Sequence, residues 1–188
     1  MDDSLLFGSS EYWLMFAILL FGRGMDFLST WVATPNLALE GNPIAKRLGW
    51  RLGAIVNVLL CFTFAMWPET TIIISTTSIL VAARNLQQAW LMRTLGEEGY
   101  RVWFVQRLIE TSFPFYVFCL LGQTALIGAV GGALVYFSEF TEFTELNPVA
   151  STKVLVIPFS IGVGIVGYAL TVLFYTLLSV WRIRRSMR

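Results

Sequence analysis

Arg23, Asp26 and Thr30 are polar residues inside an otherwise apolar run, FGRGMDFLSTW at 21–31. On a helix that turns about 100° per residue, their spacing places them within about 60° of one another, on a single face. A carboxylate in such a stripe can bind a proton or a hard cation, and a guanidinium can bind an anion. A charge at mid-membrane costs at least about 2.5–3.5 kcal/mol, so we expect both ionisable groups to face the interior of a helix bundle and to be paired.

A second polar stripe occurs further along the chain, where Arg84 and Gln88 share a helical face. Counted from the expected helix ends at about 1.5 Å per residue, Asp26, Asn57 and Arg84 lie within about 5 Å of one another in depth. We therefore predict that these three residues form a polar cluster in the inner half of the membrane.

The predicted cluster holds two arginines, Arg23 and Arg84, but only one aspartate. Two interpretations remain open. The cluster is a structural network that fixes helix packing, completed by Glu40 or Glu110 as a further carboxylate. Alternatively, it is a functional pocket in which an anionic ligand, such as a lipid phosphate or a small anion, balances the surplus charge.

The segment after this run contains Pro35 and Pro43, which prevent a regular helix through 34–43. Such a segment could fold back towards the membrane and bring Glu40 and Asn42 beneath Asp26 and Thr30. Their oxygen atoms would suit a hard cation or a proton, or Glu40 would cap the arginine network. A second Glu-x-Asn-Pro occurs at Glu145, Asn147 and Pro148; an inverted repeat would explain it, but we favour coincidence because Asn-Pro is common in turns.

An Asp and a Thr four residues apart, followed by Glu-x-Asn-Pro, resemble the pattern of an uncharacterised bacterial and archaeal family of small polytopic membrane proteins. The residues that match are Asp26, Thr30, Glu40, Asn42 and Pro43. The match covers about 25 of the 188 residues. The resemblance implies a polytopic membrane protein and selects positions of interest, without a function.

The composition of the whole chain predicts the elements that carry these residues. Apolar residues make up 56% and charged residues 13% of the chain, and the mean hydropathy is +0.70, as in integral membrane proteins. A bilayer core takes about 20 helical residues per crossing. We predict an all-α bundle, one domain over 1–188, with about five transmembrane helices at approximately 11–33, 51–67, 70–93, 113–137 and 154–180.

The distribution of basic residues predicts an N-out, C-in orientation in the cell (inner) membrane. With this orientation the outer side keeps only Lys153, whereas the inner side collects Lys46, Arg47, Arg51, Arg93, Arg101, Arg107, Arg182, Arg184, Arg185 and Arg188. The segment 97–112 mixes charges with aromatic and aliphatic residues. It is either an interfacial helix on the inner surface or an early start of the fourth span.

The chain has no histidine, which excludes His-ligated haem, zinc or chlorophyll within it. We assign no catalytic residue, metal ligand or cofactor, and we expect no nucleic-acid partner. Membrane lipids are the expected partners, together with other membrane subunits that would contact the glycines of the fourth and fifth helices. Gly128 and Gly132 form a G-x-x-x-G, and Gly162, Gly164 and Gly167 lie in an apolar run where close helix packing is the favoured interpretation.

The candidate site therefore comprises Arg23, Asp26, Thr30, Glu40, Asn42, Asn57, Arg84 and Gln88. The first hypothesis is a ligand-, ion- or lipid-headgroup-binding or transport protein. The second is an accessory or scaffold subunit of a larger membrane complex. A weaker third is a membrane enzyme that acts on lipid through paired carboxylates such as Asp26 and Glu40.

Overall fold

The computed structural model describes residues 4–40, 43–142 and 151–186, and within these ranges the chain forms five α-helices. In chain order they are α1 (Ser10–Ala33), α2 (Pro43–Phe64), α3 (Pro68–Glu110), α4 (Phe113–Glu142) and α5 (Ser151–Ser186). The prediction of an all-α fold is confirmed. Within the described part of the chain, four helical segments are long and apolar enough to cross a membrane: Ser10–Ala33, Ile44–Phe64, Phe113–Ser138 and Val156–Arg185. By the length and hydropathy of these four segments, the chain is a multi-pass membrane protein.

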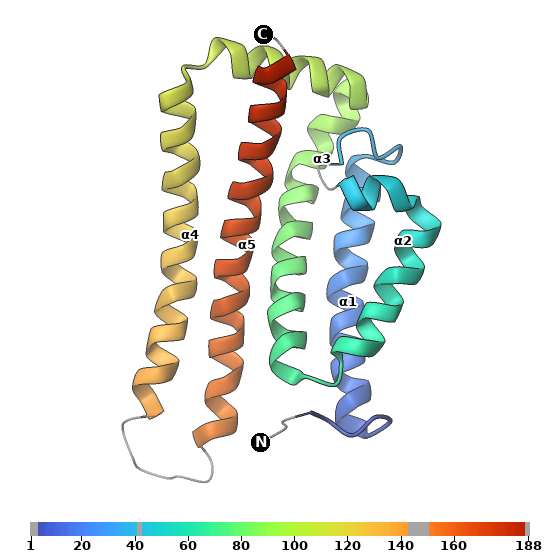
Figure 1. Cartoon of the computed structure of the whole chain (residues 1–188), viewed down its shortest axis with the longest axis vertical. Coiled ribbons are helices and arrows are strands. Elements are labelled where there is room, and N and C mark those ends of the chain that lie inside the picture. Colours follow the sequence, from blue (N-terminus) through green and yellow to red (C-terminus); the bar gives the residue numbers. More distant parts are fainter. Residues whose placement is uncertain (1–3, 41–42, 143–150, 187–188) are drawn as a thin grey trace.

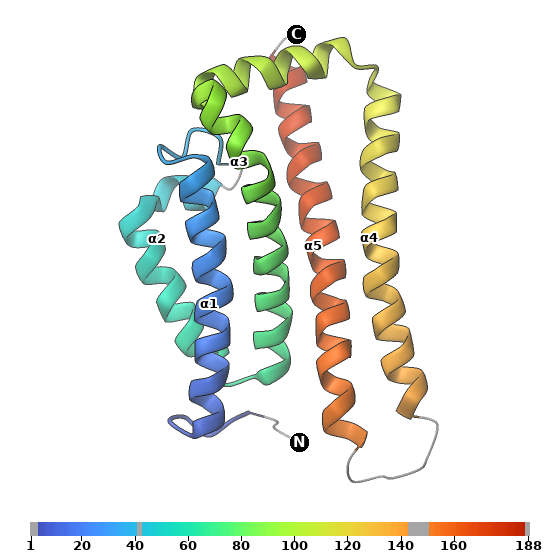
Figure 2. The same ribbon diagram turned by 180° about the vertical axis from the view of Figure 1, so that it is seen from behind.

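The predicted span at 70–93 lies within α3, which is not among those four segments. Its sequence contains many hydroxyl and amide side chains in addition to Arg84, and these lower its mean hydropathy. In space, α3 nevertheless packs along α1 on one side and α5 on the other (Figures 1 and 2). Its polar residues therefore lie largely between helices.

Two glycines with positive φ change the direction of the chain. Gly96 (φ 70°) interrupts α3, and the helix beyond it runs across the end of the bundle, over the end of α5 towards the start of α4 (Figure 1). Residues with a side chain rarely adopt this conformation, and glycine does so without steric cost. The segment after Gly96 is thus a separate helical portion that ends at Glu110, and the alternative that the fourth helix starts early is wrong. Gly49 (φ 64°) introduces a kink in α2, which separates the short segment before it from the longer apolar segment that ends at Phe64.

Small residues set the distances between the helices. A Cβ on Gly22 of α1 would lie 3.0 Å from Cα of Ser75 on α3, and a Cβ on Gly162 of α5 would lie 2.6 Å from the carbonyl oxygen of Gly131 on α4. On Gly164, a Cβ would lie 2.8 Å from Cβ of Thr76. Close packing is confirmed at Gly162 and Gly164 of the fifth helix, whereas a Cβ on Gly167 would make only an ordinary contact of 3.7 Å with Thr77.

The predicted contact through Gly128 and Gly132 does not form within the described chain. A Cβ at either position would meet nothing within 4 Å, because the neighbouring Gly131 faces α5 instead.

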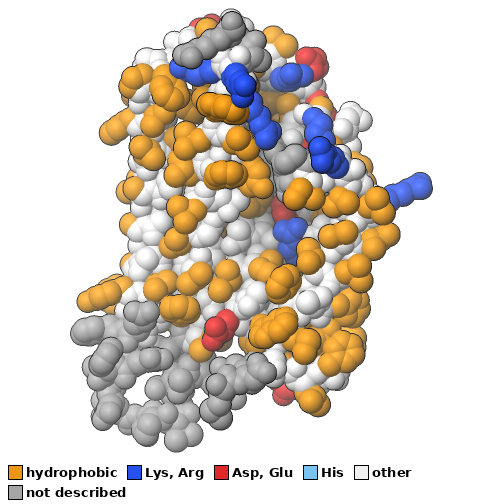
Figure 3. All heavy atoms as spheres, viewed as in Figure 1, with side chains coloured by type: hydrophobic (Ala, Val, Ile, Leu, Met, Phe, Trp, Pro, Cys, Tyr) orange, Lys and Arg blue, Asp and Glu red, His pale blue; other side chains and the backbone are white. Residues whose placement is uncertain are grey.

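The surface of the bundle is apolar around its sides and basic at one end. Phe21, Trp90, Phe118 and Leu126 are each more than 60% exposed, which suits contact with lipid rather than water. On the face in Figure 3, most Lys and Arg side chains gather at the end of the bundle where the chain crosses over, and a smaller patch of basic and acidic atoms lies at mid-height. Helix α1 begins at one end of the bundle and α5 ends at the other (Figure 1).

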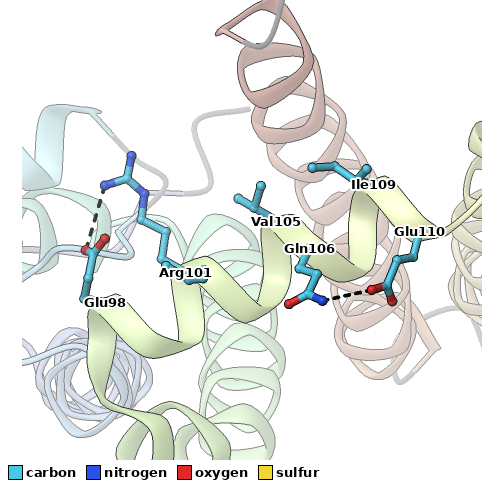
Figure 4. Close-up of a pocket in the computed structure, with 7 residues that line it drawn as sticks. Glu98, Arg101, Val105, Gln106, Ile109 and Glu110 are labelled. Atoms are coloured by element: carbon cyan, nitrogen blue, oxygen red, sulfur yellow. Dashed lines mark hydrogen bonds and ion pairs between the residues drawn. The ribbon is translucent and has the colours of Figure 1, made fainter.

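The crossing portion of α3 carries a shallow hollow on its outer side, about 590 Å³ in volume. Val105 and Ile109 line it between the polar pairs Glu98–Arg101 and Gln106–Glu110, as Figure 4 shows. The ion pair between Glu98 and Arg101 is 4.0 Å long and both side chains are mostly exposed. Such pairs contribute at most about 1 kcal/mol, so this surface is a solvated helix face.

Candidate functional site

Arg23 is the centre of a polar cluster that joins three helices. Its Nε donates a hydrogen bond of 2.8 Å to Oδ1 of Asn57 on α2, and Nη2 donates to the same oxygen. Its Nη1 donates to Oδ2 of Asp26, one turn further along α1, at 3.1 Å and to Oγ of Ser78 on α3 at 3.2 Å. The Asn57 amide in turn donates to the carbonyl oxygen of Gly53 at 2.8 Å. Every guanidinium nitrogen of Arg23 is thus hydrogen-bonded.

Asp26 is paired but not enclosed. Its side chain is 21% exposed and that of Arg23 is 30% exposed. Within the described ranges, Arg23 is the only donor to the Asp26 carboxylate, and it reaches Oδ2. Asp26 lies seven residues before the end of α1, about 10 Å along the helix axis. Among the described residues, no donor forms a hydrogen bond to the second oxygen, Oδ1.

A second polar layer lies one turn closer to the end of α1. The hydroxyls of Ser29 and Thr30 each donate to the backbone carbonyl of Asp26 at 2.9 Å. They accept hydrogen bonds from the side-chain amide of Asn85 on α3, at 3.3 and 3.2 Å. This layer fixes the rotation of α3 against α1 beside Asp26.

The loop after α1 is held by side chains from two other helices. The Glu97 carboxylate accepts from the backbone N–H groups of Asn36 at 2.8 Å and Ala38 at 3.1 Å. Arg93 donates to the carbonyl oxygen of Val32 at 2.6 Å, and the Trp50 indole donates to that of Pro35 at 2.8 Å. These contacts satisfy backbone groups that the two prolines leave outside a helix.

Glu40 is the last described residue of this loop before α2, and its carboxylate interacts electrostatically with that of Asp26. The loop therefore brings a second negative charge towards the cluster. Asn42, the remaining predicted residue of the loop, lies outside the described residues.

Arg84 lies on the other side of α3, in a groove of about 400 Å³ between α3, α4 and α5. The groove is lined by Leu80, Ala83, Arg84, Gln87, Ile127, Val130, Ile165 and Tyr168. Among the described residues, no carboxylate lies within 4.0 Å of the Arg84 guanidinium. It interacts electrostatically with two phenols, Tyr100 on the crossing portion of α3 and Tyr116 at the start of α4.

The structure thus separates the predicted site into two parts. It brings together Arg23, Asp26 and Asn57, places Thr30 one turn away, and sets Glu40 within electrostatic reach. It does not bring Arg84 to Asp26 and Asn57 as predicted, because α3 turns Ser78 and Asn85 towards α1 and Arg84 towards the groove. Gln88 is part-buried one turn beyond Arg84.

Sequence reasoning missed Ser78 and Glu97. Ser78 is seven residues before Asn85 and so shares its helical face, which is a signal that could have identified it. Glu97 gives no such signal, because its partners are backbone groups of a distant loop.

Within the described ranges of the chain, no group of three or more His, Cys, Asp or Glu side chains is placed so that it could hold a metal ion. Comparison with protein-family models, with curated proteins and with solved structures gave no match. The arrangement of the side chains is therefore the basis for inferring a function.

Proposed function

We propose that this protein is a five-span membrane protein, N-out and C-in, that binds and carries a small monovalent cation, a proton in the simplest case, at Asp26. The observation that carries the proposal is the open carboxylate oxygen of Asp26, deep along α1 beside a part-exposed ion pair. In this arrangement the α3 segment before Gly96 is a span in addition to the four apolar segments, and it is the third span in chain order. Its polar face lies against α1.

Charge favours a cation over an anion at this site. The side chain of Asp26 is a carboxylate, and within the described residues only one of its oxygens accepts a hydrogen bond, from Arg23. The Glu40 carboxylate adds an electrostatic interaction of the same sign as Asp26. A proton or a monovalent cation at Asp26 would lower the repulsion between the two carboxylates, whereas an anion would add to it.

Arg23 acts as a positioning residue in this proposal. Its bonds to Asn57 and Ser78 fix the guanidinium independently of Asp26. The aspartate can therefore gain or lose a ligand while the arginine stays in place. The purely structural alternative, in which the pair only fixes packing, gives no role to the open oxygen.

Ion flux into proteoliposomes tests the proposal. Purified protein is reconstituted with a trapped pH-sensitive dye, and a potassium diffusion potential drives protons inwards; parallel vesicles hold dyes for Na⁺ and K⁺. We expect flux of one cation well above that of empty vesicles, its loss in Asp26→Asn, and its retention in Glu98→Gln, whose carboxylate lies on the exposed crossing helix. Flux equal to empty vesicles for all three cations, or unchanged flux in a folded Asp26→Asn protein, would overturn the proposal.

A second candidate function is an accessory subunit of a larger membrane complex. One observation favours it: Gly128 and Gly132 leave an open small-residue face on α4, which packs mainly on α5 at the edge of the bundle (Figure 2). Such faces allow close helix association in membranes. Purification from its native membrane in mild detergent tests this candidate, which predicts co-purifying subunits that Gly132→Leu releases. A protein that runs at its own mass contradicts it.

A further inference from the structure

The groove that contains Arg84 is separate from the Asp26 cluster, since α3 lies between them. Its polar end is formed by Arg84 and Gln87 on α3. Its walls are apolar and come from Leu80, Ile127, Val130 and Ile165 on three helices. A volume of about 400 Å³ is within the range of about 300–1,000 Å³ that is usual for ligand pockets.

Arg84 is a cation without a matching anion in the described chain. Its guanidinium is always charged, and its planar set of N–H donors matches the oxygens of a phosphate in a two-bond geometry. An arginine within a membrane bundle is expected to be paired. The partner of this charge must therefore come from outside the described residues.

Two tyrosines that interact electrostatically with Arg84, Tyr100 and Tyr116, supply neutral donors beyond the lining of the groove. Burial raises the pKa of the Tyr100 hydroxyl above its ordinary value, against the opposing effect of the Arg84 charge. The phenol therefore stays protonated at neutral pH and can donate a hydrogen bond to an anion. Tyr100 lies on the crossing helix, where a phosphate at the membrane surface would be.

The remainder of the groove suits a hydrocarbon chain better than water. Val130 is 59% exposed, and the neighbouring Leu126, on the outer side of α4, is 73% exposed. The apolar walls thus continue into a surface suited to lipid. Basic side chains gather at the same end of the bundle as the polar end of the groove (Figure 3), and such clusters attract anionic lipids.

We infer that this groove is a binding site for one anionic phospholipid of the inner leaflet, with its phosphate on Arg84 and Tyr100 and an acyl chain along Leu80, Ile127 and Val130. The assignment of the leaflet rests on the orientation proposed above. The site itself does not depend on cation transport.

Thermal unfolding of the purified, delipidated protein in detergent tests the inference. The protein is titrated with phosphatidylglycerol, with phosphatidylcholine and with inorganic phosphate. We expect phosphatidylglycerol to raise Tm. At the same concentration, the rise in Tm with phosphatidylcholine should be at least ten times smaller, and inorganic phosphate should not raise Tm. An equal effect of phosphatidylcholine, or an equal effect of inorganic phosphate, would overturn the lipid assignment.

Two variants locate the site. Arg84→Gln removes the charge, and Val130→Trp fills the apolar part while leaving Arg84 in place; both should weaken the effect of phosphatidylglycerol at least tenfold. Arg101→Gln is the matched control, because Arg101 is a basic residue at the same end whose side chain is 69% exposed, and it should retain the effect. If Arg84→Gln fails to fold, Val130→Trp decides alone. Retention of the full effect in a folded Arg84→Gln or Val130→Trp protein would contradict the inference.

Discussion

The ion pair between Arg23 and Asp26 should be worth more to the folded protein than a surface ion pair of similar length. Removal of one partner from a fully buried pair costs about 3–5 kcal/mol, whereas exposed pairs contribute about 0–1 kcal/mol. The side chains here are 30% and 21% exposed, and Arg23 keeps its bonds to Asn57 and Ser78 when Asp26 is neutralised. We therefore expect Asp26→Asn to lower the free energy of unfolding by about 2 kcal/mol, between these limits.

A double-mutant cycle isolates the interaction itself. Arg23→Gln leaves Asp26 without its donor and also loses the bonds to Asn57 and Ser78, so it should cost more than Asp26→Asn. The double variant replaces two charges with two amides that can hydrogen-bond to each other, so it should cost well under the sum, which gives a coupling energy of about 2 kcal/mol. Unfolding in mixed micelles with increasing SDS measures all four proteins.

Arg107 and Glu110 provide the control cycle. They have the same spacing and a shorter distance of 2.6 Å, but their side chains are 60% and 47% exposed. We expect a coupling energy below about 1 kcal/mol for this pair. If the Arg23–Asp26 pair couples no more strongly than the Arg107–Glu110 pair, the reasoning that depth and burial give the intramembrane pair its strength is refuted.

Three further predictions concern packing, the loop and pH. Gly162→Ala should lower Tm by several degrees because its Cβ would lie 2.6 Å from the Gly131 carbonyl oxygen, whereas Gly132→Ala, which meets nothing within 4 Å, should not; equal Tm values would contradict the close approach of α4 and α5. Glu97→Gln should speed amide hydrogen exchange at Asn36 and Ala38, because the Glu97 carboxylate accepts hydrogen bonds from their N–H groups. The control variant Glu98→Gln should leave this exchange unchanged. Unchanged exchange in Glu97→Gln would show that other contacts hold the loop. Burial raises the pKa of Tyr100 above its ordinary value of about 10, so the unfolded state deprotonates first and the free energy of unfolding should fall as pH rises above about 10. Tyr100→Phe should reduce that fall, and an identical pH profile would contradict it.

The helices themselves could be predicted from the sequence because length and hydropathy decide them. The predicted ends of the first span, 11–33, differ by one residue from α1, and the interruption between the third span and the surface segment falls at Gly96, where only glycine suits the backbone. Pro43, expected to end the non-helical stretch, begins α2, a position that proline favours.

The rotation of α3 was not predicted, and this error separated Arg84 from the cluster. The charged residues of this helix suggested one face, but the face that packs on α1 is formed by small residues at alternating spacings of four and three: Thr71, Ser75, Ser78, Ala82, Asn85 and Ala89. Small residues allow backbones to approach closely in membranes, so they determine which face is buried. A polar stripe shows on which side of a helix the charges lie. The stripe of small residues shows which side of the helix packs against its neighbour.

Whether Asp26 is open to a ligand is the most direct test of the proposed function. An experimental structure of the protein in lipid nanodiscs, at a resolution that shows ordered water, would examine Oδ1 of Asp26. We predict density for a water molecule or an ion within hydrogen-bonding distance of this oxygen, about 2.5–3.2 Å, between α1 and α3. An Oδ1 enclosed by apolar side chains, or bonded only to protein donors, would contradict the account.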